Sequence, residues 1–308
     1  MKRFLALFLT ILLLPLSALA REQRRVFYED ETEPFPEDAA LLTLRVCPLL
    51  GADCMLLTLG EHTMLVDAGM EYQYPQVRQM LEEAGVTRLE YLFNSHPHDD
   101  HAGSIVPLVR DGFPIGTFFT LFPHDYQGYY MIQISTLRAL EAAGVPIVDL
   151  KSEDTIPFGD ARITVYRIPV EWNPDEPECN DLSGVLMVRY GECSLLLTAD
   201  LDVRAQSRII KLYDLQADIM KYPHHGSRPT FRAFLKAVDP EYTFFTHSSF
   251  NTQEAQEDLR TNGYRRMTFA TWGTITLQSD GQKWIVRQDI EADLMDYVEK
   301  YREYFNIR

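Results

Sequence analysis

The sequence is short of basic residues. Its 308 residues include 29 Lys and Arg against 45 Asp and Glu, which gives a formal net charge of −16 at pH 7. A chain with this balance repels nucleic acid and anionic lipid at long range. Non-specific nucleic-acid binding is therefore disfavoured unless basic side chains are segregated locally on the surface.

Cysteines are also few. The four, Cys47, Cys54, Cys179 and Cys193, lack the paired short spacing of a structural zinc site. Cys47 and Cys54 flank a turn between two expected strands, so a disulfide between them is one alternative outside the cell. Four buried free thiols are the other.

Long apolar runs are absent beyond residue 20. The first twenty residues combine Lys2 and Arg3, an apolar stretch and the small-residue end Ala18-Leu19-Ala20. This pattern predicts a secretory signal peptide over 1–20, and therefore a secreted or cell-envelope protein. An uncleaved anchor is the alternative, although the run is short for a membrane span. No other stretch implies a transmembrane partner, and cleavage after Ala20 would leave 27 basic against 45 acidic residues, a net charge of −18.

The remaining chain divides into three parts. Residues 21–39 are rich in proline and acidic side chains and predict a linker or loosely held arm. Residues 40–288 alternate strands, hairpins and helices, which indicates one two-sheet α/β domain. Within it we expect a helix over 209–215 and a continuous strand over 268–277. Residues 289–308 predict an amphipathic helix docked on the domain, because Ile290, Leu294, Val298, Tyr301 and Phe305 recur at helical spacing.

The most informative stretch is Asn94-Ser95-His96-Pro97-His98-Asp99-Asp100-His101. It lies between an expected strand over 89–93 and an expected helix, so neighbouring side chains can turn inward together. Three of the eight histidines in the chain fall within these residues. The four candidate ligands are of the types that suit zinc, iron or manganese: His96, His98, Asp100 and His101.

Three other positions follow expected strands. Asp200 comes after the apolar run 195–198 and is either a metal ligand or the N-cap of a helix. His224 and His225 follow the strand expected over 217–222, and Asp67 follows the strand over 64–66.

The pattern His96-x-His98-x-Asp100-His101 resembles the signature of the metallo-β-lactamase superfamily. The resemblance implies a four-layer αβ/βα sandwich with a metal pair at its edge, zinc first, with manganese or iron as alternatives. It implies that His96 and His98 bind one metal, that Asp100 and His101 bind the other, and that Asp200 bridges them. One of His224 and His225 would complete the second metal site while the other contacts substrate, and Asp67 would orient a ligand histidine from outside the coordination sphere.

Within the superfamily, residues 41–288 resemble the hydrolase domain of ComEC-type competence proteins, through the run 180–200, the run His224-His225-Gly226-Ser227 and the opening hairpin at Gly51-Ala52-Asp53. The chain departs from the superfamily pattern because no histidine stands about twenty residues before Asp200. One metal rather than two is therefore an alternative, with Asn180 as a candidate oxygen donor.

The resemblance implies a metal-dependent hydrolase that cleaves phosphodiester bonds, with Asp100, His224 and His225 as the catalytic candidates. An esterase or lactonase acting on wall or signal molecules, and a noncatalytic binding module, are the alternatives. The net charge favours a small or cell-wall-derived substrate over nucleic acid.

Overall fold

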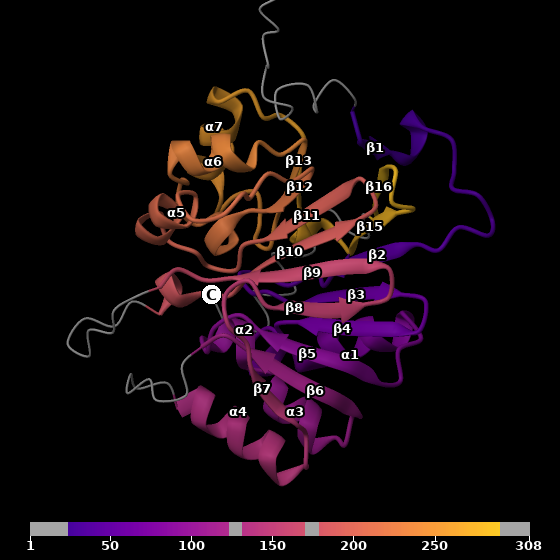
Figure 1. The fold of residues 1–308 in the computed structure, drawn as a ribbon, viewed down its shortest axis with the longest axis vertical. Coiled ribbons are helices and arrows are strands. Elements are labelled where there is room, and N and C mark those ends of the chain that lie inside the picture. The colour runs from indigo at the N-terminus through magenta and orange to yellow at the C-terminus, as the bar shows by residue number, and fades with distance from the viewer. Residues whose placement is uncertain (1–23, 123–130, 170–178, 290–308) are drawn as a thin grey trace, which may run out of the picture.

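Two β-sheets packed face to face form the body of the protein (Figure 1). The structure, a computed structural model, describes residues 24–122, 131–169 and 179–289. The larger sheet runs, from edge to edge, through β1 (Val26–Tyr28), β16 (Trp284–Gln288), β15 (Ile275–Ser279), β2 (Leu42–Val46), β3 (Met55–Leu59), β4 (His62–Val66), β5 (Leu89–Asn94), β6 (Ile115–Thr120) and β7 (Ile147–Asp149). Its strands from β16 to β4 pair antiparallel, and those from β4 to β7 pair parallel.

The smaller sheet has the same mixed character. Its strands run through β14 (Met267–Phe269), β13 (Tyr242–Phe245), β12 (Ile219–Lys221), β11 (Cys193–Leu197), β10 (Val185–Tyr190), β9 (Ala161–Tyr166) and β8 (Thr155–Phe158). The strands from β14 to β11 pair parallel, and the rest form an antiparallel meander.

Alternation of apolar side chains along the strands builds three layers of core. One face of each sheet contributes to a shared cluster between the sheets, with Leu44 and Leu57 from one sheet and Ile163 and Leu195 from the other. The outer face of the larger sheet packs on α1 (Tyr74–Glu83), α2 (Asp99–Ala102), α3 (Ile105–Arg110) and α4 (Met131–Ala142). The outer face of the smaller sheet packs on α5 (Val203–Ile209), α6 (Arg232–Val238) and α7 (Gln253–Thr261). The predicted four-layer αβ/βα sandwich is therefore confirmed.

Part of the predicted arm belongs to the larger sheet. Residues 26–28 form β1, which pairs parallel with β16, and the Val26 side chain is fully buried. The backbone N–H groups of Arg25 and Val26 donate to the Glu241 carboxylate. Tertiary pairing thus overrides the weak apolar pattern of this segment. The predicted signal peptide and the predicted C-terminal helix from Ile290 onward lie outside the described residues.

Two predicted elements within the domain are wrong. The helix predicted over 209–215 is instead α5, which ends at Ile209; it starts at Val203 because the Asp202 carboxylate accepts the Val203 N–H as an N-cap. The strand predicted over 268–277 is split between the two sheets. The break lies at Gly273, whose φ of 135° is open to glycine and strained for other residues.

All four cysteines are buried, and no disulfide joins any two of them. No helix in the described part of the chain has the length and apolarity needed to span a bilayer.

Candidate metal centre

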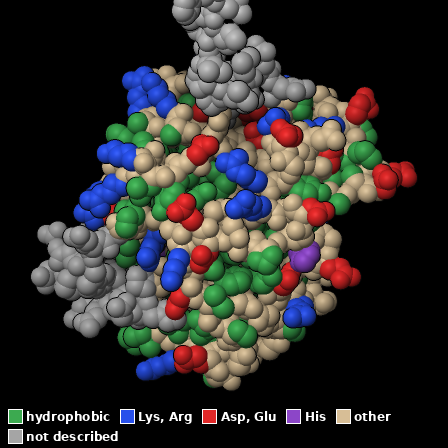
Figure 2. Space-filling view, viewed as in Figure 1, with side chains coloured by type: hydrophobic (Ala, Val, Ile, Leu, Met, Phe, Trp, Pro, Cys, Tyr) green, Lys and Arg blue, Asp and Glu red, His purple; other side chains and the backbone are tan. Residues whose placement is uncertain are grey.

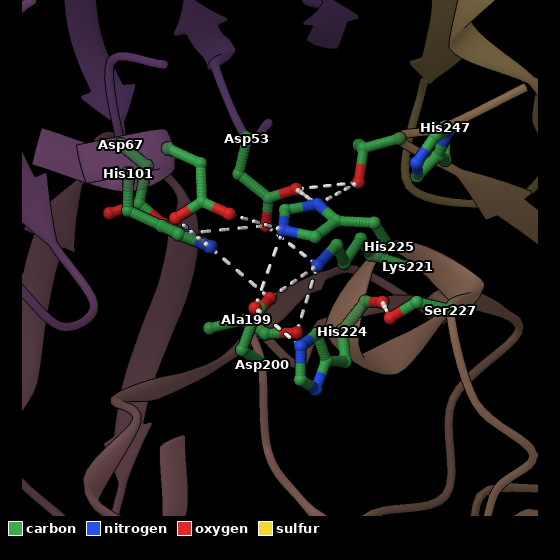
Figure 3. A network of polar contacts seen from close by, with 12 residues as sticks. Asp53, Asp67, His101, Ala199, Asp200, Lys221, His224, His225, Ser227 and His247 are labelled. Atoms are coloured by element: carbon green, nitrogen blue, oxygen red, sulfur yellow. Dashed lines mark hydrogen bonds and ion pairs between the residues drawn. The ribbon is translucent and has the colours of Figure 1, made fainter. Parts of the chain in front are cut away.

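The candidate site lies where strands of both sheets end. Asp67 follows β4, the histidine loop follows β5, and Asp200 follows β11. The pair His224-His225 follows β12 within the short 3₁₀ turn η5 (Pro223–Gly226). Because the carboxyl ends of parallel strands meet at one edge, residues more than a hundred positions apart converge there (Figure 3).

Asp67 fixes one of the histidines. Its Oδ2 accepts from His101 Nδ1 at 2.8 Å and from the Ser95 hydroxyl at 2.7 Å. Its Oδ1 accepts from Asn94 Nδ2 at 2.9 Å and from the Ser95 N–H at 2.8 Å. Since a carboxylate only accepts, His101 carries a proton on Nδ1, and its Nε2 faces the site. Asp67 therefore contacts His101 from the side away from the site, and its role as the outer partner of a metal ligand stays a prediction.

Asp53 holds a second histidine in the same way. His225 Nδ1 lies 3.0 Å from Asp53 Oδ1 and 2.9 Å from the Thr246 hydroxyl, which itself donates to Asp53 Oδ1 at 2.6 Å. His225 Nε2 is thereby aimed at the site, 3.2 Å from Asp100 Oδ2 and 3.3 Å from Asp200 Oδ2.

The inward-facing atoms fit a divalent cation. His101 Nε2 lies 3.2 Å from Asp200 Oδ1. His101 Nε2, His225 Nε2 and Asp200 Oδ1 are buried and have no hydrogen-bond partner among the described residues. One ligand atom each from Asp53, His101, Asp200 and His225 can be chosen so that all four lie within 4.8 Å of one another. Buried polar atoms of native proteins nearly always have partners, so these orphaned atoms indicate a site built for a metal.

Charge is concentrated at this site in the absence of metal. Burial lowers the pKa of His101, but Asp200, Asp100 and Asp67 outweigh it and hold that pKa well above its usual value. The pKa of His225 is likewise held well above its usual value, because the Asp200 and Asp53 carboxylates outweigh the effect of burial. Burial alone would raise the pKa of Asp200, yet the charges of His225 and His101 hold it well below its usual value. The carboxylate is therefore ionised at neutral pH.

His96 and His98 form a separate pair beside this group. His96 Nε2 and His98 Nδ1 face each other at 3.1 Å, and the His96 ring lies 4.1 Å from the His101 ring between centroids. Burial lowers the pKa of both imidazoles, so both are neutral at pH 7 and are of the form that binds metals.

His224 stands at the rim. Its Nε2 lies 3.7 Å from Asp200 Oδ2, and its side chain is 23% exposed whereas that of His225 is 5% exposed. Burial also lowers the pKa of His224. Asp67, Ala199, His224 and His225 all have φ between 47° and 55°, a region uncommon for residues other than glycine. Such strain is typical of functional sites.

The structure thus brings together Asp100, His101, Asp200 and His225, and it places His225 rather than His224 deepest in the site. Asn180 has a buried Oδ1 without a hydrogen-bond partner among the described residues, and its part in metal binding stays a prediction. The N-cap alternative for Asp200 is wrong, because Asp202 caps α5.

Sequence reasoning missed two members, Asp53 and Lys221. Lys221 is fully buried, with Nζ 2.7 Å from Asp53 Oδ2. A lysine at the end of a strand that is otherwise apolar was the available signal, because buried lysines are rare unless paired. Asp53 in a turn carries no comparable signal.

Solved structures share this fold. The metallo-beta-lactamase fold protein YhfI from Bacillus subtilis matches with a TM-score of 0.53 at 15% identity, over 78% of this chain and all of that one. CmlA, a diiron beta-hydroxylase from Streptomyces venezuelae, matches with a TM-score of 0.51 at 14% identity, over 80% of this chain and 55% of that one. At such identities the likeness concerns the fold alone.

Two characterised proteins are similar in sequence. ComE operon protein 3 of Bacillus subtilis (strain 168) is 26% identical over 167 residues, which is 52% of this chain and 20% of that protein. Competence protein ComA of Neisseria gonorrhoeae is 24% identical over 247 residues, which is 78% of this chain and 32% of that protein. The chain therefore spans between a fifth and a third of the length of these relatives. The family model of the metallo-beta-lactamase superfamily matches residues 47–247, and the chain belongs to this superfamily.

Proposed function

We propose that the protein is a metal-dependent hydrolase that cleaves phosphodiester bonds. The observation that carries the proposal is the convergence of His101 Nε2, His225 Nε2 and Asp200 Oδ1, all buried without hydrogen-bond partners among the described residues. The superfamily is typically one of metal-dependent hydrolases, and the similarity to competence proteins favours a phosphodiester.

The residues take the following roles. Asp100, His101, Asp200 and His225 hold a divalent cation, zinc first and manganese or iron as alternatives, while His96 and His98 offer a second pair of nitrogens. A cation so held supplies an activated water and stabilises negative charge that develops on the substrate. Asp67 and Asp53 keep His101 and His225 in the tautomers that present Nε2.

His224 is the candidate substrate contact. It is neutral at pH 7 because burial lowers its pKa, so its imidazole can donate or accept a proton at the rim of the site. Asp100 is the candidate proton relay. Burial would raise its pKa, but the neighbouring His101 and His225 lower it below the usual value, and it stays a carboxylate.

Charge near His224 favours an anionic substrate. The Arg228 side chain is 64% exposed, and its positive charge contributes to the lowered pKa of His224. Its ion pair with Asp202, at 3.3 Å, is exposed and therefore weak. A guanidinium beside the rim suits a phosphodiester better than a neutral ester.

We propose a small or cell-wall-derived phosphodiester rather than long nucleic acid as the substrate. On the face shown in Figure 2, Lys and Arg side chains are interspersed with Asp and Glu, so that face has no continuous basic stripe. The N-terminal pattern of the sequence supports export to the cell envelope or beyond.

The test is turnover of bis(4-nitrophenyl) phosphate by the purified protein with Zn²⁺ or Mn²⁺. We expect Asp200→Asn to lose more than about 100-fold in kcat/KM, because it removes a charge that faces both histidines. Asp160→Asn, in an exposed turn, is the matched control and should retain full turnover.

Three outcomes would count against the proposal. Equal turnover by Asp200→Asn and the unaltered protein would reject this site. Turnover of carboxylic esters or lactones, with none of phosphodiesters, would favour the esterase alternative. Failure to retain metal during purification in metal-containing buffer would instead favour a noncatalytic module.

A further inference from the structure

Lys221 is a buried cation within the candidate metal centre. Its Nζ lies 2.7 Å from Asp53 Oδ2 and 3.5 Å from Asp200 Oδ1, and it donates to the Ala199 carbonyl at 2.8 Å. The side chain has no exposed surface. A buried ammonium group is costly unless charged partners surround it, so this lysine calls for an explanation beyond packing.

Two carboxylates compete for a place around the metal. Asp53 and Asp100 both approach His225, but from opposite sides of its ring. Asp100 Oδ2 lies 3.2 Å from Nε2, on the side of the orphaned atoms, whereas Asp53 Oδ1 lies 3.0 Å from Nδ1. Asp53 is nevertheless close enough to the group to serve as a ligand. A further contact must therefore determine which of the two carboxylates would coordinate the metal.

The contacts of Asp53 point to Lys221 as that determinant. One oxygen of Asp53 accepts from Thr246 and lies beside His225 Nδ1, and the other forms the ion pair with Lys221. Oδ2 has no hydrogen-bond partner among the described residues, so the Lys221 ion pair is the contact that occupies it. A divalent cation that recruited Asp53 would have to displace the ammonium group, leaving Lys221 buried beside a second positive charge.

Lys221 also steadies the turn that presents Asp200. The Ala199 carbonyl accepts from Lys221 Nζ and from the His224 N–H at 3.0 Å. Ala199 has a φ of 47°, a strained conformation that persists only where neighbouring contacts hold it. The same ammonium group therefore contacts the carbonyl next to Asp200 and the carboxylate behind His225.

We propose that Lys221 is a positioning residue that sets the ligand choice of the metal centre. Its ion pair reserves Asp53 as the outer partner of His225 Nδ1, so the metal binds Asp100 and Asp200 but not Asp53. The inference rests on metal binding alone and not on the bond that is cleaved, so its test uses no substrate.

The experiment measures Co²⁺ binding by the purified full chain, as affinity against a competing chelator and as the visible absorption of the bound ion. We expect Asp53→Asn to keep the wild-type Co²⁺ spectrum while losing about 10–100-fold in affinity, as when an outer partner is altered. Asp200→Asn should lose binding altogether. Lys221→Met frees Asp53 to bind, so its Co²⁺ spectrum should change.

A double variant and a control complete the design. Adding Asp53→Asn to Lys221→Met removes the freed carboxylate and should restore the wild-type spectrum, which a purely structural role for Lys221 would not do. Lys236→Met, an exposed lysine on α6, should change nothing. A wild-type spectrum in Lys221→Met, or loss of binding in Asp53→Asn as complete as in Asp200→Asn, would overturn the proposal. Should Lys221→Met alone fail to fold, the Asp53→Asn spectrum decides.

Discussion

Substitution of Asp67 by asparagine tests how the protein fixes the tautomer of His101. Asp67 is buried and accepts four hydrogen bonds, two on each oxygen. Asparagine keeps the shape but turns one acceptor into an NH₂ group. If the amide oxygen stays with Asn94 and the Ser95 N–H, the NH₂ group faces His101 Nδ1 and favours the tautomer with its proton on Nε2.

That change directs a proton at the position of the metal. We expect Asp67→Asn to weaken metal binding by about 10–100-fold, which corresponds to about 1.4–2.7 kcal/mol. Chelator competition with Zn²⁺ measures the affinity, and ¹⁵N shifts of the imidazole report the tautomer in the metal-free protein at a pH above the raised pKa of His101, where the ring is neutral. Asp160→Asn is the matched control. Unchanged affinity together with a switched tautomer would refute the reasoning, because the outer carboxylate would then not govern the ligand.

Two further predictions concern protons and packing. Because carboxylates hold the pKa of His101 and of His225 well above the usual value, both are cationic at pH 7 without metal. Metal binding should therefore release about two protons and should weaken as the pH falls. Calorimetry in buffers of different ionisation enthalpy counts the released protons, and heats that do not depend on the buffer would contradict the expectation. Gly226→Ala should lower the free energy of unfolding by about 2–4 kcal/mol, because a Cβ would overlap the Phe245 ring at a φ of 88°. Gly263→Ala, at a φ of 95° in open space, isolates the backbone contribution, and denaturant unfolding that fails to separate the two variants would exclude the overlap as the cause.

Local patterns in the sequence predict the layers of the fold because strand and helix periodicity reflects which face is buried. Local patterns fail where a single contact or backbone conformation determines where an element begins or ends. The start of α5 depends on the Asp202 cap, and the exchange of sheets after β14 depends on one glycine conformation at Gly273. The pairing of residues 26–28 with β16 joins segments more than 250 positions apart, which no local pattern encodes.

The candidate site likewise contains some residues that the sequence predicts and others that it does not. Histidines clustered within one loop, such as His96 and His101, are visible in the sequence because ligand chemistry and spacing coincide there. Lys221 and Asp53 lie 168 positions apart by residue number, and their ion pair exists only because strands of two different sheets end at a common edge. From the sequence alone, a single aspartate in a turn looks the same whether or not it belongs to a functional site. The difference appears only when the sheet edge at which the strands end is known.

Register nevertheless offers a route to Asp53. The hairpin of β3 and β4 pairs Met55 with Val66, so the residues just before β3 lie beside those just after β4. Asp53 and Asp67 are therefore neighbours across the hairpin end, and the Gly69 N–H donates to the Asp53 carbonyl at 2.8 Å. Once Asp67 is assigned behind one histidine, hairpin geometry alone places a second carboxylate at the same edge. Two carboxylates from one hairpin thus contact two histidines that come from different sheets, which fixes both imidazoles at the edge where the sheets meet.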